Sequence, residues 1–326
     1  MKRVLVIVVT HNGMHWIPRC LASVASTKNA QNVDGEANNG VASTKNAQNV
    51  DGTVTVDVYV LDNDSTDGSA DYIQGNFPQV HLVRSADNLG FTGGNNLGFQ
   101  YALEHGYDYV YLLNQDAWLE EVALEKLVAA AEAHPEYAVL SPLQMTDGFT
   151  AFDAQFAKLF HPGTKTAQNA PKCVPEGDSG AKSAQNAPEC IEVQRIMAAH
   201  WLMPVKAIKE IGQFSELFPY YGQDDDWCHR AHYHCWKVGV VPEARAVHDR
   251  AQRQESKDRI IDRNYRVGSL VRLCNINRPL WERFLFVCLF TLVKSVKYCS
   301  LLPFKHFHSL CRQLPQIRAH RRHCKA

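Results

Sequence analysis

The sequence predicts an α/β protein with a mostly parallel central sheet flanked by helices. Apolar segments of strand length alternate with helical patterns up to residue 141. Two of these segments, 58–61 and 109–113, end directly in polar clusters, as strands of an open parallel sheet do at a ligand-binding edge. A mostly β-branched run at 4–9 has the composition of a strand that is buried on both faces.

Each element follows from a local pattern. The run Val4–Val9 is the first strand, residues 16–25 form a helix, and Val54–Leu61 is the second strand. The Ser65-Thr66-Asp67 sequence caps a helix that runs to about Gln74. Further strands are expected at 80–84, 107–113 and 137–141, and further helices at 94–104 and at 120–134, where an amphipathic pattern stops before Pro135.

Composition excludes few functions. The 326 residues suffice for one large α/β domain or two smaller ones, and 34 basic side chains balance 34 acidic ones, so no net charge attracts nucleic acid. Ten cysteines without a Cys-x-x-Cys pair indicate reduced thiols more than a disulfide framework. The six-residue apolar stretch after Met1-Lys2-Arg3 is too short for the core of a signal peptide.

Two pairs of near-identical segments interrupt the alternating pattern. Residues 24–35 recur at 41–52, and residues 166–173 nearly recur at 183–190, each with an offset of 17. These segments contain little to bury, and two copies are too few for a solenoid. We expect tandem insertions in surface loops at about 26–52 and 161–190.

The C-terminal part has a different texture. From Arg278 onward there are ten Lys or Arg residues and one acidic residue, and residues 284–293 carry no charge. Ten apolar residues cannot span a bilayer, which takes about 20. Arg283, Thr291, Lys294 and Lys297 share one side of a helix, which favours a helix lying in a membrane interface. The alternative is a helix packed on the main domain with a solvated basic tail.

Five motifs occur in a fixed order, at 8–13 (Val-Val-Thr-His-Asn-Gly), 61–69 (Leu-Asp-Asn-Asp-Ser-Thr-Asp-Gly-Ser), 88–96 (Asn-Leu-Gly-Phe-Thr-Gly-Gly-Asn-Asn), 112–117 (Leu-Leu-Asn-Gln-Asp-Ala) and 221–228 (Tyr-Gly-Gln-Asp-Asp-Asp-Trp-Cys). Together they resemble the inverting family 2 glycosyltransferases of GT-A fold, in particular the rhamnosyltransferase-like branch of bacterial polysaccharide synthesis. The resemblance covers about residues 3–250, apart from the two insertions.

The resemblance implies a GT-A domain at 1–255, and the composition of the C-terminal part predicts a helical, basic, membrane-associating region at 256–326. The resemblance also implies a nucleoside-diphosphate sugar donor, a glycan or lipid-linked saccharide acceptor, and no nucleic acid partner. A basic, apolar tail on a cytoplasmic enzyme places it at the periphery of the inner face of the cytoplasmic membrane.

The same resemblance implies donor-binding residues at the strand ends. Thr10, Asn12, Asp62 and Asn63 would line the nucleotide pocket, with Asp62 accepting hydrogen bonds from the base or ribose. A different explanation of residues 62–65 is an Asx turn that caps the next helix, and both can hold at once.

A glycine-rich turn at 88–96 leads into a helix, and its start favours anions. Gly90 and Gly94 permit a close backbone approach. The resemblance implies that Asn88, Asn95 and Asn96 lie near the donor.

Asn114-Gln115-Asp116 stands where the family has an Asp-x-Asp metal motif, and the chain departs from it at Asn114. The resemblance implies that Asp116 ligates Mg²⁺ or Mn²⁺, which prefer oxygen ligands. His248, at the end of a later strand, would approach the metal from the far side. Helix capping by Asp116 and a structural His248 are the alternatives.

The acidic run at 224–226 stands where the family has its general base, with Gln223 in place of a glutamate. Crowded carboxylates raise one another's pKa, which improves a base near neutral pH. We assign the base to Asp224, with Asp226 next. An exposed acidic loop is the alternative.

Three rival functions remain. A nucleotidyltransferase would carry its glycine-rich loop directly after the first strand, and a nicotinamide-dependent oxidoreductase would carry Gly-x-Gly-x-x-Gly there; neither is present. The third is a catalytically inactive sugar-nucleotide-binding or scaffold protein at the membrane, which the loss of the glutamate at Gln223 leaves open.

Overall fold

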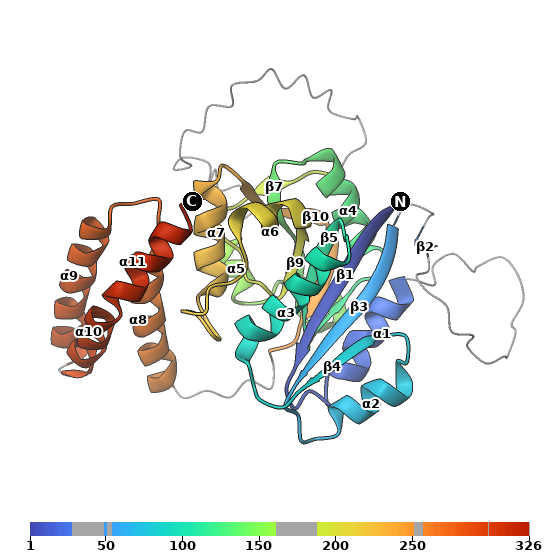
Figure 1. The fold of residues 1–326 in the computed structure, drawn as a ribbon, viewed down its shortest axis with the longest axis horizontal. Coiled ribbons are helices and arrows are strands. Elements are labelled where there is room, and N and C mark those ends of the chain that lie inside the picture. Colours follow the sequence, from blue (N-terminus) through green and yellow to red (C-terminus); the bar gives the residue numbers. More distant parts are fainter. Residues whose placement is uncertain (28–48, 51–53, 161–187, 251–256, 299, 326) are drawn as a thin grey trace, which may run out of the picture.

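The computed structural model describes residues 1–27, 49–50, 54–160, 188–250, 257–298 and 300–325. Its strands are β1 (Lys2–Thr10), β2 (Asn49–Val50), β3 (Val54–Asn63), β4 (His81–Ser85), β5 (Tyr109–Asn114), β6 (Ala117–Leu119), β7 (Tyr137–Met145), β8 (Ile191–Glu192), β9 (His200–Pro204) and β10 (Lys237–His248). These strands form one sheet, drawn in Figure 1.

The order of the strands is β2-β3-β1-β5-β9-β7-β10-β6, with β4 paired to β3 and β8 paired to β10. The pairs of β1 with β3 and β5, of β3 with β4, and of β7 with β10 are parallel. The strand β9 is inserted between β5 and β7 and runs antiparallel to both. The sheet is therefore mixed but mostly parallel, as the alternating pattern predicts.

Helices cover both faces of the sheet (Figure 1). The helical elements before residue 240 are α1 (Ile17–Thr27), α2 (Ser69–Asn76), α3 (Gly90–Glu104), α4 (Ala123–Ala133), η1 (Asp147–Phe149), α5 (Phe156–Leu159), α6 (Val205–Ile211) and α7 (Gln223–Tyr233). One buried cluster joins one face of the sheet to α1, α2 and α4. A second cluster joins the opposite face to α3, α6 and α7.

The elements expected from the sequence are present, with shifted ends. The expected helix at 94–104 begins four residues earlier, at Gly90, and the strand expected at 137–141 continues to Met145. The insertions expected at about 26–52 and 161–190 lie almost wholly outside the described residues.

Four helices make up the C-terminal part: α8 (Lys257–Cys274), α9 (Leu280–Tyr298), α10 (Leu302–Arg312) and α11 (Leu314–His323). They lie together beside α7 (Figure 1). A third buried cluster joins them to Phe218 of the loop before α7, through side chains that include Leu270, Val287, Leu310 and Ile317.

Helix α9 presents mainly apolar side chains to solvent. Thr291, on the side that the sequence groups with the basic residues, is buried, and its Oγ1 donates to the carbonyl of Val287 (2.7 Å). Apart from Lys297, the exposed positions are apolar: Trp281, Leu285, Phe286, Leu289, Leu292, Val293 and Val296. Among the described residues, none of the helices combines the length and the apolar character needed to cross a membrane.

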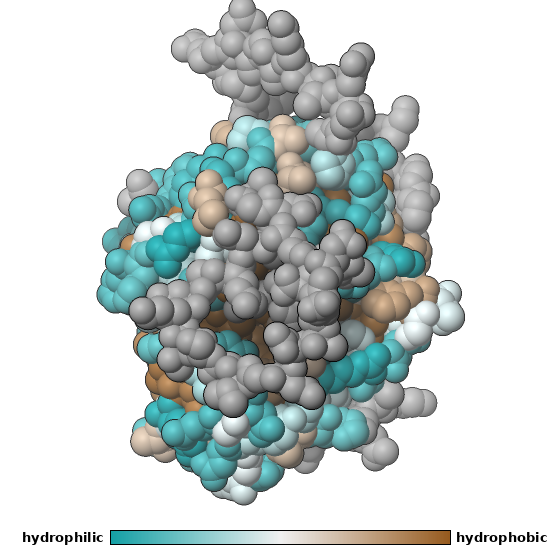
Figure 2. Space-filling model, turned by 90° about the vertical axis from the view of Figure 1, so that its right-hand side faces the viewer, coloured by the Kyte–Doolittle hydropathy of each residue, from teal (hydrophilic) through white to brown (hydrophobic). Residues whose placement is uncertain are grey.

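The opposite side of the molecule differs from α9. The described residues visible there are mostly hydrophilic, with hydrophobic residues toward the middle (Figure 2).

The cysteines follow the expectation of reduced thiols with one correction. Cys20, Cys190, Cys228, Cys274, Cys288, Cys311 and Cys324 are free. Cys235 is disulfide-bonded, so reduced thiols do not hold throughout the chain.

Candidate active site

Three strand ends lie at one edge of the sheet. In the parallel register of β1 and β3, Thr10 is opposite Asp62, and in that of β1 and β5, Val9 is opposite Asn114. The polar residues that follow β1, β3 and β5 in the sequence therefore meet at the same edge, where open parallel sheets bind ligands.

The end of β1 is tied to both neighbouring loops. Thr10 Oγ1 donates to Gln115 Oε1 (2.8 Å), which connects β1 to the loop after β5. Asn12 has a positive φ of 49°, and its Oδ1 accepts from the backbone nitrogen of Thr66 (2.8 Å). The sequence predicted no role for Gln115, but the side chain of Gln115 connects the Asn114-Gln115-Asp116 motif to β1.

Asp62 is buried, with 4% of its surface exposed, and its two oxygens differ. Oδ2 accepts from the backbone nitrogen of Ser65 (3.2 Å), as an Asx turn requires. Oδ1 is buried without a hydrogen-bond partner among the described residues. An unpartnered buried acceptor is costly, so this oxygen is available to a ligand that carries a donor.

Two asparagines shape the glycine-rich turn. Asn63 Nδ2 donates to Asn88 Oδ1 (2.9 Å), and Asn63 Oδ1 accepts from the nitrogen of Leu89 (2.7 Å). The same Asn88 oxygen accepts from the nitrogen of Gly90 (2.9 Å). Gly90 has a φ of 72°, and a Cβ there would lie 2.9 Å from the carbonyl of Pro219, so only glycine fits.

The helix α3 uses its small and polar residues for packing. A Cβ on Gly94 would lie within 3 Å of side chains of β1 and β3, so Gly94 lets the helix sit close to the sheet. The side chain of Asn95 donates to the carbonyl of Phe91 (2.8 Å), and that of Asn96 donates to the carbonyl of Phe214 (2.9 Å). Both amide nitrogens are thus engaged by the protein's own backbone.

Asp116 and His248 face each other although 132 positions separate them in the sequence. The antiparallel pair of β6 and β10 places His248 opposite Ala117. Asp116 Oδ1 lies 3.5 Å from His248 Nε2, and both side chains are buried. Arg250 Nη2 lies 3.2 Å from the other ring nitrogen, Nδ1. A carboxylate and an imidazole at this edge suit a divalent cation such as Mn²⁺.

A second histidine, His200, lies close to the pair formed by Asp116 and His248. The ring of His200, on β9, contacts the hydroxyl of Tyr111 through Nδ1 (2.9 Å) and the carbonyl of Val247 through Nε2 (3.0 Å). Burial and then the neighbouring His248 lower the pKa of His200 to about 3, so its ring is neutral at physiological pH. The sequence contains no signal for this contact, because it joins strands that are far apart in the chain.

The first turn of α7 carries the acidic run, and its members differ. Asp226 is buried and paired with Arg230 Nε (2.9 Å) and His320 Nε2 (2.9 Å). Burial alone would raise the pKa of Asp226, but Arg230 and His320 hold it below its usual range. Asp226 is therefore a stably charged anchor, which favours a structural role over that of a base.

Asp224 has the opposite character. It is partly exposed, and its Oδ1 accepts from the backbone nitrogen of Asp225 (3.0 Å). Burial and then the charge of Asp225 raise the pKa of Asp224 to about 7. Arg195 pairs with Asp225 (2.7 Å), which leaves Asp224 as the carboxylate that exchanges its proton near neutral pH.

One short segment links Asp224 to the metal motif. Arg195 contacts Asp225, and four residues later the carbonyl of Ala199 accepts from the nitrogen of Asn114 (3.1 Å). Four residues of extended chain reach at most about 14 Å. The segment 195–199 thus contacts both the start of α7 and the end of β5.

The loop before α7 also touches the glycine-rich turn. Tyr220 Oη donates to Asn88 Oδ1 (3.4 Å), and the nitrogen of Thr92 donates to the carbonyl of Pro219 (3.0 Å). The loop that leads into α7 and Asp224 therefore packs on the glycine-rich turn.

A cluster that sequence reasoning missed lies behind α7. Asp226, Cys274 and His320 bring possible ligand atoms within 4.8 Å of one another, from α7, α8 and α11. Arg230 already neutralises Asp226 in this cluster. The evident role of the cluster is therefore to hold α11 against α7. Spacings of 46 to 48 residues gave no sequence signal for it.

Comparison with known proteins identifies a family. Residues 5–173, about half of the chain, match the family model described as Glycosyl transferase family 2. No curated protein matches the chain.

Solved structures match the fold more widely. A mannosyltransferase from Pyrobaculum calidifontis, in complex with GDP-Man and Mn²⁺, matches with a TM-score of 0.57 and 15% identity, over 86% of this chain and 66% of that one. S. aureus TarS 1–349 with UDP-GlcNAc matches with 0.50 and 15%, over 87% and 70%. GalNAc-T7 with UDP, GalNAc and Mn²⁺ matches with 0.50 and 13%, over 82% and 48%. At such identities the likeness shows the fold, and the expected GT-A architecture is confirmed.

Proposed function

The chain belongs to glycosyl transferase family 2, and from this premise we propose an inverting enzyme that moves a hexosyl group from a nucleoside-diphosphate sugar to a glycan or lipid-linked saccharide. The five motifs in their order favour the rhamnosyltransferase-like branch, and hence a role in cell-surface polysaccharide synthesis.

The observation that carries the proposal is the free oxygen of Asp62. Its Oδ1 is buried at the strand-end edge without a partner among the described residues, while Oδ2 is held by the turn. An N–H of a base or an O–H of a ribose would supply the missing hydrogen bond. Thr10 and Asn12 border this position through their bonds to the adjacent loops.

The neighbouring residues suit the diphosphate. Asp116 and His248, with Asn114 at the end of β5, would hold Mg²⁺ or Mn²⁺. A bound cation offsets the charge that develops on a departing nucleoside diphosphate. The backbone of the turn around Gly90 and the N-terminus of α3 would face the phosphates.

Asp224 is the proposed general base. With a pKa raised to about 7, its carboxylate can take the proton of the acceptor hydroxyl at neutral pH. The acceptor oxygen then forms a bond to the anomeric carbon as the bond from that carbon to the diphosphate oxygen breaks. This single displacement inverts the anomeric configuration. Asp226, held charged in two ion pairs, is the weaker candidate.

The C-terminal helices provide a membrane contact in this proposal. Helix α9 exposes an apolar face, and Lys294 and Lys297 lie in its last turns. Apolar side chains would enter the headgroup region while basic side chains face anionic lipid. We therefore divide the chain into a GT-A domain at 1–255 and a membrane-associating region at 256–326, peripheral on the inner face of the cytoplasmic membrane.

The test is thermal stabilisation by a panel of nucleoside diphosphates, with and without Mn²⁺. A ligand of the native state at 100 times its Kd stabilises by about 2.7 kcal/mol, so one nucleotide should raise the Tm clearly. Asp62→Asn should weaken this effect, and Asp116→Asn should abolish its dependence on Mn²⁺. Asp71→Asn, an exposed aspartate on α2, is the matched control and should behave as the wild type.

Two results would contradict the proposal. One is that no nucleoside diphosphate stabilises the protein. The other is that Asp62→Asn and Asp116→Asn respond to the nucleotide as Asp71→Asn does. Hydrolysis of the stabilising donor sugar in the presence of Mn²⁺ then separates an enzyme from an inactive binding protein.

A further inference from the structure

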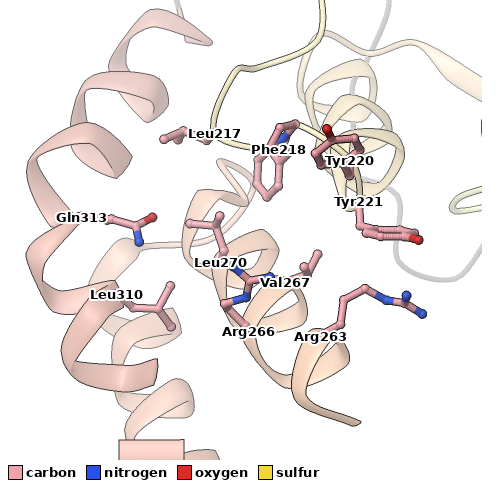
Figure 3. Close-up of a pocket in the computed structure, with 11 residues that line it drawn as sticks. Leu217, Phe218, Tyr220, Tyr221, Arg263, Arg266, Val267, Leu270, Leu310 and Gln313 are labelled. Carbon is pink, nitrogen blue, oxygen red and sulfur yellow. The ribbon is translucent and has the colours of Figure 1, made fainter. Parts of the chain in front are cut away.

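A cavity of about 540 Å³ lies between the loop before α7 and the helices α8 and α10 (Figure 3). The loop contributes Phe218, Tyr220 and Tyr221, and α10 contributes Leu310. The cavity therefore joins the GT-A part of the chain to its C-terminal helices.

One face of α8 gives the cavity its charge. Arg263, Arg266, Val267 and Leu270 follow the spacing i, i+3, i+4 and i+7, which places them on one side of a helix. Among the described residues that line the cavity, two are arginines and none is acidic. The guanidinium of Arg263 lies 4.2 Å from the ring centre of Tyr221, whereas Arg266 is exposed and has no ion pair within the part of the chain that the structure describes.

The lining is thus of two chemical kinds. The planar guanidinium group of one arginine can donate two parallel hydrogen bonds to the oxygens of a phosphate. Tyrosine rings offer an apolar face and a hydroxyl, which suits the mixed surface of a sugar. A ligand that fits both carries a phosphate next to a saccharide.

The position of the cavity connects it to the reaction. Tyr220 donates from Oη to Asn88 of the glycine-rich turn, and Asp224 follows Tyr220 by four residues. The intervening Gly222 has a φ of 89°, and a Cβ there would lie 2.7 Å from Val267. This turn therefore packs directly on α8, and the cavity is lined by the loop that leads into the helix of the proposed base.

The arginines are separate from the candidate donor site. Asp62 and Asp116 lie at the strand-end edge of the sheet, whereas Arg263 and Arg266 come from α8, beyond the residues that match the family model. The buried cluster that includes Leu270 and Leu310 also contains Val287 of α9, the helix with the exposed apolar face. A ligand in the cavity would thus be close to lipid.

We propose that this cavity binds the phosphate-bearing end of the acceptor, a diphosphate that joins a saccharide to a lipid, with Arg266 and Arg263 on the phosphates and Tyr220 and Tyr221 against the first sugar. The assignment of the ligand as acceptor rests on the proposed function. The lipid tail would leave the cavity toward α9, and the sugar would extend toward Asp224.

The test uses decyl diphosphate as the probe, titrated calorimetrically into the full chain in decyl maltoside micelles. The wild type should bind it, and Arg266→Gln should weaken binding by at least tenfold, because a charged hydrogen bond is lost. Arg322→Gln, which removes an exposed arginine of α11 outside the cavity, is the matched control and should bind as the wild type.

Two further arms separate other sources of phosphate. Asp116→Asn should bind decyl diphosphate normally, because the donor site is elsewhere; a loss there would place the probe in the donor site and overturn the proposal. Micelles that contain phosphatidylglycerol should bind Arg266→Gln and the wild type equally. A parallel loss in those micelles would assign the arginine to bilayer headgroups and overturn the proposal as well.

Thermal stabilisation by nucleoside diphosphates distinguishes a failure of this proposal from a failure of the proposed function. Arg266→Gln should retain the thermal shift that the best nucleotide gives. If no nucleotide shifts the wild type, the proposed function fails and the acceptor assignment fails with it. If nucleotides act normally but Arg266→Gln binds decyl diphosphate like the wild type, only the assignment of the cavity fails.

Discussion

The strand β5 and the helix α9 are both strongly apolar, but the fold treats them in opposite ways. Leu112 in β5 is 1% exposed, and the strand has neighbours on both sides and helices on both faces. Leu289 in α9 is 54% exposed, and the helix packs by one side only. An apolar segment that is enclosed on all sides holds the polar residues at its end in fixed positions. A segment that is only half covered leaves apolar surface to which another molecule can bind.

The difference in burial between β5 and α9 matches two different roles in the proposed function. The end of β5 carries Asn114 and Asp116 at the candidate donor site, where small displacements would matter. The exposed face of α9 offers apolar area with basic charge nearby. Four predictions test whether chemistry belongs to the sheet edge and placement to the C-terminal helices.

The largest expected effect is on turnover. Asp224→Asn should lower kcat by about 10²–10⁴-fold, because an amide cannot accept the proton of the acceptor. The donor nucleotide should still stabilise the variant. In the wild type, the rate should fall as the pH drops through about 7, where Asp224 becomes protonated. The measurement is the initial rate of sugar transfer against pH.

Asp226→Asn provides the contrast to this variant. Because Asp226 pairs with Arg230 and His320, its loss should lower the free energy of unfolding.

A near-normal rate of sugar transfer in Asp224→Asn would remove Asp224 from the mechanism.

The next effect is on stability and compares the two apolar segments directly. Leu112→Ala should lower the free energy of unfolding by about 2–5 kcal/mol, because it leaves a cavity in a closed core. Leu289→Ala should change it by no more than about 0.5 kcal/mol. Urea unfolding of both variants gives the two values.

The same exposed leucine should affect membrane binding instead. Leu289→Ala should weaken association with anionic vesicles by about tenfold, since a half-exposed leucine would bury part of its surface in lipid. Leu112→Ala, measured below its Tm, should bind vesicles as the wild type. Equal vesicle binding of the wild type and Leu289→Ala would contradict the role of α9.

The last prediction concerns the contact between the two regions. Burial alone would lower the pKa of His320, but Asp226 and Cys324 raise it to about 9. A folded pKa above the unfolded value of about 6.5 adds stability below pH 6.5 that is lost as the pH rises toward 9, at most about 3 kcal/mol. His320→Ala should remove this pH dependence, and His323→Ala, an exposed histidine of the same helix, should not. Identical pH profiles for the two variants would show that His320 does not couple α11 to α7.

Much of the fold was predictable because its signals are local. Val4–Val9 is apolar and mostly β-branched, which favours a buried strand, and Asp62 and Asp116 lie at or just after the ends of β3 and β5. The antiparallel insertion of β9 between β5 and β7 was not predictable, because no local pattern tells a strand which neighbour it will pair with. The side of α9 that faces outward was equally hidden, since a cover for Thr291 comes from other helices.

The candidate site divides in the same way. Residue types and their order were sufficient to name Thr10, Asp62, Asp116 and Asp224, because each lies in a short motif next to a strand or helix end. The sequence could not tell Asp224 from Asp226. That difference depends on Arg230, one turn away, and on His320, 94 positions away.

The sequence by itself determined the alternating strands and helices, the polar strand ends and the family, because hydrophobic periodicity and contiguous motifs are properties of neighbouring residues. Only the tertiary structure decided the partners of buried charges, the free oxygen of Asp62, the cavity beside α8 and the outward face of α9. Each of these depends on which distant side chain or helix occupies the adjacent space, and a linear pattern does not contain that information.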